Sequence, residues 1–224
     1  MVTETQQASS ARESRRFWGA GLWMGCLQFF GGEAIAAFAW RGAYRYRLNF
    51  ISDLGAVGPV GGAGSSPLHA VMNASFGLQG ALIVGGAVLL WPLFPSSRTG
   101  RLALGLIAAS GFGVLLVGLA PEDAFPRLHY LGAVENLVFC NVGAALLGVA
   151  LLRDNSAAGV VSLAAGLLGL AGVAALAAGA DFGLGPGGVE RVAAYPFPLW
   201  IAGMGAWVMA GGIAARPPAR LTPR

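Results

Sequence analysis

The sequence predicts an all-α protein, a polytopic integral membrane bundle of six transmembrane helices with both termini in the cytoplasm. Hydrophobic residues make up 56% of the chain and charged residues only 11%. A soluble domain has about 25% charged residues, so this composition would expose apolar surface to water. A bilayer-spanning helix needs about 20 mostly apolar residues. Six runs meet that length: 17–40, 69–90, 102–119, 129–152, 159–180 and 195–214.

The length of 224 residues suits one bundle and leaves no room for a second sizeable domain. We expect residues 1–16 to form a disordered cytoplasmic tail, 17–214 the transmembrane domain and 215–224 a basic cytoplasmic tail. Arginines precede the first apolar run, as they do in signal peptides. That run is longer than the roughly 7–15 residues of a signal-peptide core, so we interpret it as an uncleaved first helix.

The arginines predict the orientation, because cytoplasmic segments of membrane proteins carry the excess of basic residues. With the N-terminus inside, nine arginines lie on the cytoplasmic side and five on the outer side. The net charge of +4 does not indicate nucleic-acid binding, because the arginines are scattered over several helix ends. We therefore expect a multi-pass protein of the cell membrane, with membrane lipids and no nucleic acid as partners.

The links between the apolar runs differ in length on the two sides. On the outer side we predict a long loop over residues 41–68 and a glycine-rich loop over 181–194. The cytoplasmic links, 91–101 and 153–158, are short. Abundant glycine and alanine within the runs indicate helices that approach one another closely through small residues.

Polar side chains within the runs gather toward the outer side. Glu33 lies seven residues before Trp40, which places it roughly 10 Å below the outer surface. Asn73 and Asn136 also fall in the outer halves of their helices. Polar groups within a bilayer are costly and often functional, so we predict an outward-facing polar pocket. An alternative interpretation is that these groups pair with one another and only lock the helices together.

Short motifs along the chain resemble those of a known family. They are Asn49–Gly55 (NFISDLG), Met72–Phe76 (MNASF), Pro121–Asp123 (PED), His129–Ala133 (HYLGA), Gly188–Arg191 (GVER) and Tyr195–Pro196. Their order and spacing resemble the bacterial and archaeal membrane-protein family catalogued as domain of unknown function 998. The Ile-Ser-Asp part is also remotely similar to the Frag/DRAM/Sfk membrane proteins. The resemblance implies a compact six-helix bundle and no particular activity.

The function favoured by this pattern is the binding or handling of a lipid or lipid-like small molecule in the outward-facing pocket. The outer loops would form its roof and the polar residues of the helices its floor. We expect no cofactor. The predicted ligand-binding residues are Glu33, Asp53, Asn73, Asn136, Glu190 and Arg191.

Two other classes of function stay open. A membrane-embedded hydrolase or acid/base enzyme could act on a lipid or prenyl substrate, with Asp53, His129 and Glu135 as candidate catalytic residues. His69, His129 and Asp53 are of the ligand types found in catalytic zinc sites, but they lack a close-spaced histidine motif, so we predict no metal. A non-catalytic membrane scaffold would use the same charged residues as structural ion pairs.

Overall fold

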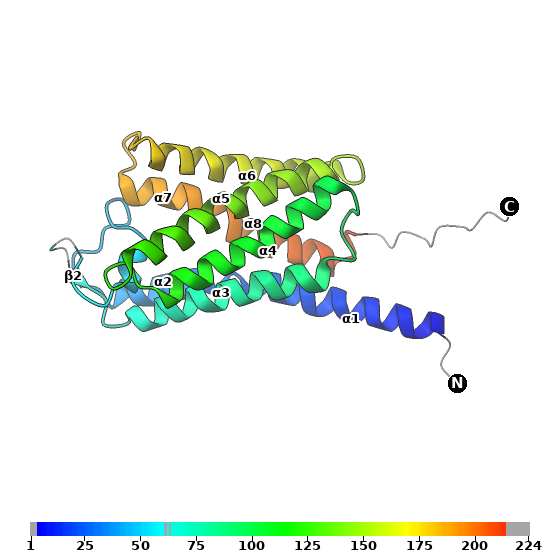
Figure 1. The fold of residues 1–224 in the computed structure, drawn as a ribbon, viewed down its shortest axis with the longest axis horizontal. Helices are drawn as coiled ribbons and strands as arrows, with labels where there is room; N and C mark the ends of the chain where they lie inside the picture. Colours follow the sequence, from blue (N-terminus) through cyan, green and yellow to red (C-terminus); the bar gives the residue numbers. More distant parts are fainter. Residues whose placement is uncertain (1–3, 61, 63, 214–224) are drawn as a thin grey trace.

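The structure, a computed structural model, describes residues 4–60, 62 and 64–213 and is mostly helical (Figure 1). Among the described residues, five helices are long and apolar enough to cross a membrane. These are α3 (His69–Leu90), α4 (Arg98–Leu119), α5 (Pro126–Leu151), α6 (Ser156–Ala177) and the pair α7 (Pro186–Ala194) and α8 (Pro196–Met209), which together form one apolar stretch.

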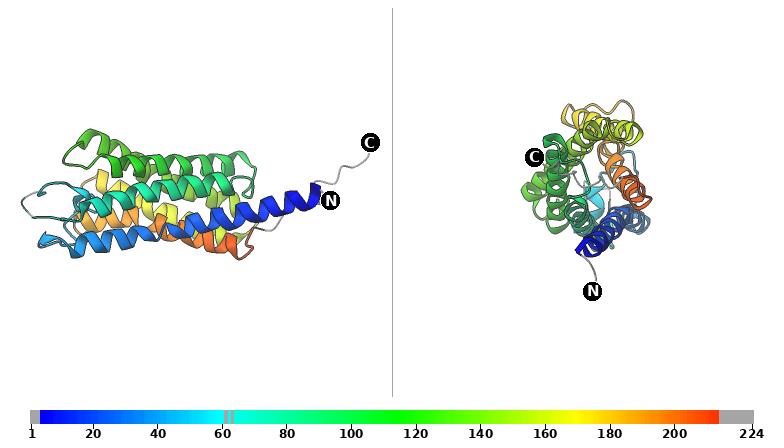
Figure 2. Two further views of the ribbon diagram at one scale, coloured as in Figure 1. Left: turned by 90° about the horizontal axis from the view of Figure 1, so that it is seen from below. Right: turned by 90° about the vertical axis from the view of Figure 1, so that its right-hand side faces the viewer.

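The helices are arranged as a closed ring (Figure 2). Helix α3 packs on α4, α4 on α5, α5 on α6, and α6 on both α7 and α8. Helix α1 (Glu4–Gly25) contacts both α8 and α3 and so completes the ring. Helix α1 begins and α8 ends at the same end of the bundle (Figure 1), which we call the tail end. The opposite end is covered by the long segment between α2 (Gln28–Phe38) and α3, and we call it the cap end.

Glycines set the close spacing of neighbouring helices, as the composition predicts. A side-chain carbon at Gly132 would lie 2.6 Å from the carbonyl oxygen of Gly113, across the contact between α5 and α4. At Gly148 it would lie 2.7 Å from the carbonyl oxygen of Gly159, across the contact between α5 and α6. Helices in lipid associate through such contacts, because apolar burial gives them little advantage over lipid tails.

The first predicted span, 17–40, is divided between α1 and α2. Helix α1 ends at Gly25 and α2 begins at Gln28. Through the joint the backbone makes short-range hydrogen bonds, from Cys26 N–H to the Trp23 carbonyl and from Phe29 N–H to the Cys26 carbonyl, both 3.2 Å long. The chain therefore tightens locally and continues toward the cap end, as the left view of Figure 2 shows.

Two sequence-based boundaries differ from the structure. Helix α1 starts at Glu4, so residues 4–16 are helical where the sequence predicts a disordered tail. The predicted outer loop over 181–194 is wrong in its second half, because α7 occupies it. Gly185, with φ of 76°, ends the turn and Pro186 takes the first helical position, where its missing N–H breaks no helical bond. The predicted C-terminal tail, 215–224, lies outside the described residues.

The segment that covers the cap end is ordered by a small hairpin and a single helical turn. Strand β1 (Arg41–Gly42) pairs antiparallel with β2 (Gly64–Ser65). Between them lies the 3₁₀ turn η1 (Ser52–Gly55), which contacts α2 and α3. The predicted loop 41–68 is therefore a folded cap, and its Ile51 and Leu54 are buried in the core.

Candidate functional site

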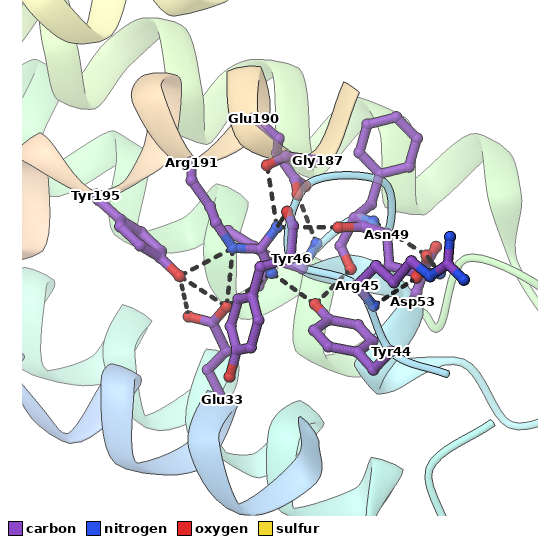
Figure 3. A network of polar contacts seen from close by, with 12 residues as sticks. Glu33, Tyr44, Arg45, Tyr46, Asn49, Asp53, Gly187, Glu190, Arg191 and Tyr195 are labelled. Carbon is purple, nitrogen blue, oxygen red and sulfur yellow. Dashed lines mark hydrogen bonds and ion pairs between the residues drawn. The ribbon is translucent and has the colours of Figure 1, made fainter. Parts of the chain in front are cut away.

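A buried ion pair joins α7 to α2 near the cap end (Figure 3). The guanidinium group of Arg191 lies 2.9 Å from the carboxylate of Glu33, and the two side chains are 9% and 3% exposed. The hydroxyl of Tyr195 lies 2.7 Å from both oxygens of that carboxylate. Two predicted ligand-binding residues, Glu33 and Arg191, are therefore partners of each other.

The remaining donors of Arg191 hold the cap. Its Nη1 donates to the carbonyl oxygens of Tyr46 and Asn49, at 2.8 and 2.9 Å, and to that of Gly187. Its Nη2 also donates to the hydroxyl of Tyr44, at 2.6 Å. Burial raises the pKa of that Tyr44 hydroxyl, so it stays neutral. Every guanidinium nitrogen thus has a protein acceptor, and Arg191 fastens the cap to α7.

Acidic side chains receive the backbone N–H groups of the same cap. The Asp53 carboxylate accepts hydrogen bonds from the Asn49 amide and the Phe50 N–H, both at 3.0 Å, as Figure 3 shows for Asn49. The Glu190 carboxylate accepts from the N–H of Ile51. The predicted site residues Asp53 and Glu190 therefore fix the local conformation of the Asn49–Gly55 motif.

Two further contacts hold the next stretch of the cap. The Asn73 amide of α3 donates to the carbonyl oxygen of Gly55 at 2.8 Å. The Asp123 carboxylate accepts from the N–H groups of Val57 and Gly58 at 3.0 and 2.8 Å. Burial acts to raise the pKa of Asp123, but these donors outweigh it and hold the pKa below its ordinary value.

Asparagines of α5 tie that helix to its neighbours. The Asn136 amide donates to the carbonyl oxygen of Ser110 on α4 at 2.9 Å. Deeper along the helix, the fully buried Asn141 donates to the carbonyl oxygen of Ala193 on α7 at 2.9 Å. Its side-chain oxygen abuts Gly169 of α6. Asn141 therefore joins three helices at one point.

A cavity of about 70 Å³ lies among the helices beneath the cap, and we call it the outer cavity. Its polar lining comes from α3, α5, α7 and the cap, and its apolar lining includes aromatic side chains of α2, α3 and α8. The polar residues are Ser52, Gln79, His129, Asn136 and Glu190, and the aromatic residues are Phe29, Phe76 and Phe197. Among the predicted ligand-binding residues, Asn136 and Glu190 line this cavity, whereas Glu33, Asp53, Asn73 and Arg191 do not.

The imidazole of His129 has a fixed orientation at the wall of the outer cavity. Its Nδ1 lies 2.9 Å from the carbonyl oxygen of Ala120, so Nδ1 is the donor, and in the neutral imidazole Nε2 is an acceptor. Nε2 lies 4.0 Å from a carboxylate oxygen of Glu122. His129 is 4% exposed. The arrangement presents one acceptor nitrogen beside one carboxyl group.

Glu122, in the link between α4 and α5, is a carboxyl group with a raised pKa. It contacts the Ser52 hydroxyl and the Asp53 carboxyl. Burial, together with the neighbouring Asp53 carboxylate, raises the pKa of Glu122 from its ordinary 4.5 to about 7. Glu122 is therefore partly protonated at neutral pH and can donate a hydrogen bond.

The other sequence candidates lie apart. Glu135 packs against Gly113 of α4, and one of its carboxylate oxygens is buried without a partner among the described residues, as is Nδ1 of His69. His69, His129 and Asp53 do not meet, and no group of three His, Cys, Asp or Glu side chains within the described ranges could hold a metal ion.

Several members of these networks are not among the residues predicted from the sequence. Gln28 donates to the side-chain oxygen of Gln79 at 3.2 Å and accepts from the Ser75 hydroxyl at 2.9 Å, which links α2 to α3. A glutamine inside an apolar run is itself a signal, because its amide needs partners in lipid. The tyrosines that surround Arg191 gave no such signal, since aromatic residues at span ends are common.

Comparison with known protein families supports the family that the sequence motifs indicate. A family model described as a protein of unknown function, DUF998, matches residues 23–207. No curated protein and no solved structure gives a significant match. The remote similarity to the Frag/DRAM/Sfk proteins is not tested by these comparisons. The matched range runs from the end of α1 to α8, and the chain belongs to the DUF998 family.

Proposed function

We propose that this protein crosses the cell membrane six times, with both termini in the cytoplasm, and binds the polar end of a lipid-like amphiphile in the outer cavity. The first crossing would be made by α1 and α2 together, since their joint continues in one direction. The orientation is supported by Arg191, whose charge is balanced by Glu33. That leaves four outer arginines against nine inner ones in the sequence.

The observation that carries the binding proposal is the mixed lining of the outer cavity. Ligand sites combine a mostly apolar wall with a few placed polar groups. Here Ser52, His129, Asn136 and Glu190 face the same space as three phenylalanine rings. A volume of about 70 Å³ admits the end of a molecule rather than a whole lipid. An amphiphile of the outer leaflet presents such an end directly beneath the cap.

The proposal is tested by filling the cavity from a neutral wall. Ala133 lines it, so Ala133→Leu would occupy the space without removing a hydrogen bond. Val134, the next residue of α5, is 61% exposed and points away, so Val134→Leu is the matched control. We expect native mass spectrometry of the full-length protein in mild detergent to show a co-purified amphiphile in the native protein and the control. Its loss in Ala133→Leu alone supports the proposal. Equal retention in both variants refutes it.

A second candidate, acid/base catalysis, is favoured by the pair of His129 and Glu122. One presents an acceptor nitrogen and the other a carboxyl group whose pKa is raised to about 7. A general acid and base work best with pKa values near the operating pH. Glu122→Gln keeps the hydrogen-bonding shape of the group but removes its titration. If the protein is an enzyme, the Glu122→Gln variant should still bind the co-purified amphiphile but no longer convert it. If the protein only binds the amphiphile, the variant should behave as the native protein does.

A further inference from the structure

A second and larger cavity lies at the tail end, opposite the outer cavity. Its volume is about 580 Å³, within the range of small-molecule sites. It is bounded by the link between α3 and α4, the link between α5 and α6, one face of α1 and the end of α8. The arginines that line it come from three separate elements and are Arg12, Arg101 and Arg153.

These arginines make few hydrogen bonds or ion pairs with the described residues. Nη1 of Arg101 donates to the carbonyl oxygen of Trp91, and its guanidinium lies 5.2 Å from the centre of the Trp91 ring. That leaves Nε and Nη2 of Arg101 with no hydrogen-bond partner in the described part of the chain. Neither Arg12 nor Arg153 takes part in an ion pair with a described residue. Within residues 4–60, 62 and 64–213, the cavity therefore has donors without a protein acceptor.

The surroundings add positive potential. The described tail end holds six arginines against three acidic residues, Glu4, Glu13 and Asp154, of which Asp154 lines the cavity. Asn155, which lines the cavity, caps the N-terminus of the 22-residue helix α6 by accepting from the Ala158 N–H at 2.9 Å. The N-terminal end of a helix carries partial positive charge and favours anions. Arginine and a helix N-terminus together match a phosphate group.

Aromatic side chains near the cavity fit a position at a membrane interface. Phe17 and Trp18 of α1 lie shortly after Arg12 and are 56% and 62% exposed. Trp91 lies at the end of α3, and Trp207 of α8 lines the cavity wall. Tryptophan is enriched where lipid headgroups meet the hydrocarbon, and basic pockets at that level bind anionic headgroups.

We propose that this tail-end cavity is a phosphate-binding site, filled either by the headgroup of an anionic phospholipid or by a soluble phosphate compound. Arg12, Arg101 and Arg153 bind the phosphate oxygens from three sides. Trp207 and Phe94 form an apolar wall for the rest of the ligand. The site is separate from the outer cavity and does not depend on the function proposed for it.

The test compares two pairs of charge-removing variants in the full-length protein in mild detergent. Arg12→Gln with Arg153→Gln removes two cavity arginines. Arg15→Gln with Arg98→Gln removes two exposed arginines of the same end that do not line the cavity. Both double variants lose the same charge, so general electrostatic attraction falls equally in both. Size-exclusion profiles and thermal midpoints establish that each variant is folded.

Binding is measured in two arms, by native mass spectrometry with phosphatidylglycerol against phosphatidylcholine and by calorimetry with inorganic pyrophosphate. We expect the Arg12→Gln, Arg153→Gln variant to bind the preferred ligand at least about tenfold more weakly, because it loses charge-assisted hydrogen bonds. The control pair should change the affinity by less than about twofold. A cavity-specific loss with phosphatidylglycerol identifies a lipid headgroup, and one with pyrophosphate a soluble phosphate. Equal losses in both pairs, or no binding in either arm, would overturn the proposal.

Discussion

The guanidinium group of Arg191 and the carboxylate of Glu33 lie 2.9 Å apart, although the two residues are separated by 158 positions in the sequence. Around this pair meet α7, α2 and the carbonyl oxygens of the cap (Figure 3). Because Arg191 has protein partners on every nitrogen, it joins α7 to α2 and to the cap. The outer cavity lies beside this network.

Removing the charge of Arg191 leaves the carboxylate of Glu33 buried without its partner. Arg191→Gln should lower the free energy of unfolding by about 3 kcal/mol or more, because removing one partner of a buried ion pair costs about that much. Thermal or denaturant unfolding in detergent measures it. Arg127→Gln, at an exposed position near the cap end, is the matched control and should change stability by less than about 0.5 kcal/mol.

The double variant Glu33→Gln with Arg191→Gln extends this test. Removing both charges avoids the unpaired carboxylate, so the double variant should be less destabilised than the sum of the two single variants. Strict additivity would show that the two groups do not interact, contrary to the geometry.

The position of the Asn141 side chain predicts a steric effect of substitutions at Gly169. The Asn141 side-chain oxygen occupies the space that a methyl group at Gly169 would need, so Gly169→Ala should destabilise the protein by about 1–3 kcal/mol. Gly105→Ala, where nothing lies within 4 Å, should instead be neutral or stabilising. Unfolding measurements on both decide the matter. If Asn141→Ala restores stability in the Gly169→Ala background, the clash is the cause.

Glu122 predicts a dependence of stability on pH. Its pKa rises from an ordinary 4.5 in the unfolded chain to about 7 in the folded protein, so the folded state holds the proton more tightly. The contribution of Glu122 is fully present below pH 4.5 and is lost as the pH rises to about 7. Thermal midpoints across this range should therefore fall with rising pH. The slope should flatten in Glu122→Gln and stay unchanged in the exposed control Glu13→Gln.

The proposed topology can be tested with single cysteines, because the native Cys26 and Cys140 are both buried. Val57→Cys and Phe182→Cys place thiols at exposed cap-end positions, and Ser96→Cys places one at the tail end. A membrane-impermeant maleimide applied to intact cells should label the first two and spare the third. The reverse labelling pattern would mean that the orientation is the opposite one. Labelling of only one of the two cap-end thiols would contradict an even number of crossings between them.

The helical architecture could be predicted because it follows from run lengths and composition. The five apolar helices begin or end within a few residues of the predicted spans, except where Gly185 and Pro186 start α7 inside a segment that looks like a turn. The division at Cys26 could not be predicted, because no proline or charge marks it. Such joints depend on packing against neighbouring helices.

Only part of the candidate site could be predicted from the sequence. Polar residues such as Glu33 and Asn136 stand out against an apolar background, and this identified the cap end as the polar end. Their partners did not stand out, since Asn73 and Arg191 bond to backbone carbonyl oxygens of the cap. A carbonyl group exists at every residue, so the choice between a ligand site and a structural contact depends on the fold.

The most direct test of the proposed function is the thermal response of lipid-stripped protein when the co-purified amphiphile is added back. A ligand that binds only the folded state raises its unfolding temperature. We predict a concentration-dependent rise in the native protein and in Val134→Leu, and no rise in Ala133→Leu. The same rise in all three proteins would contradict binding in the outer cavity.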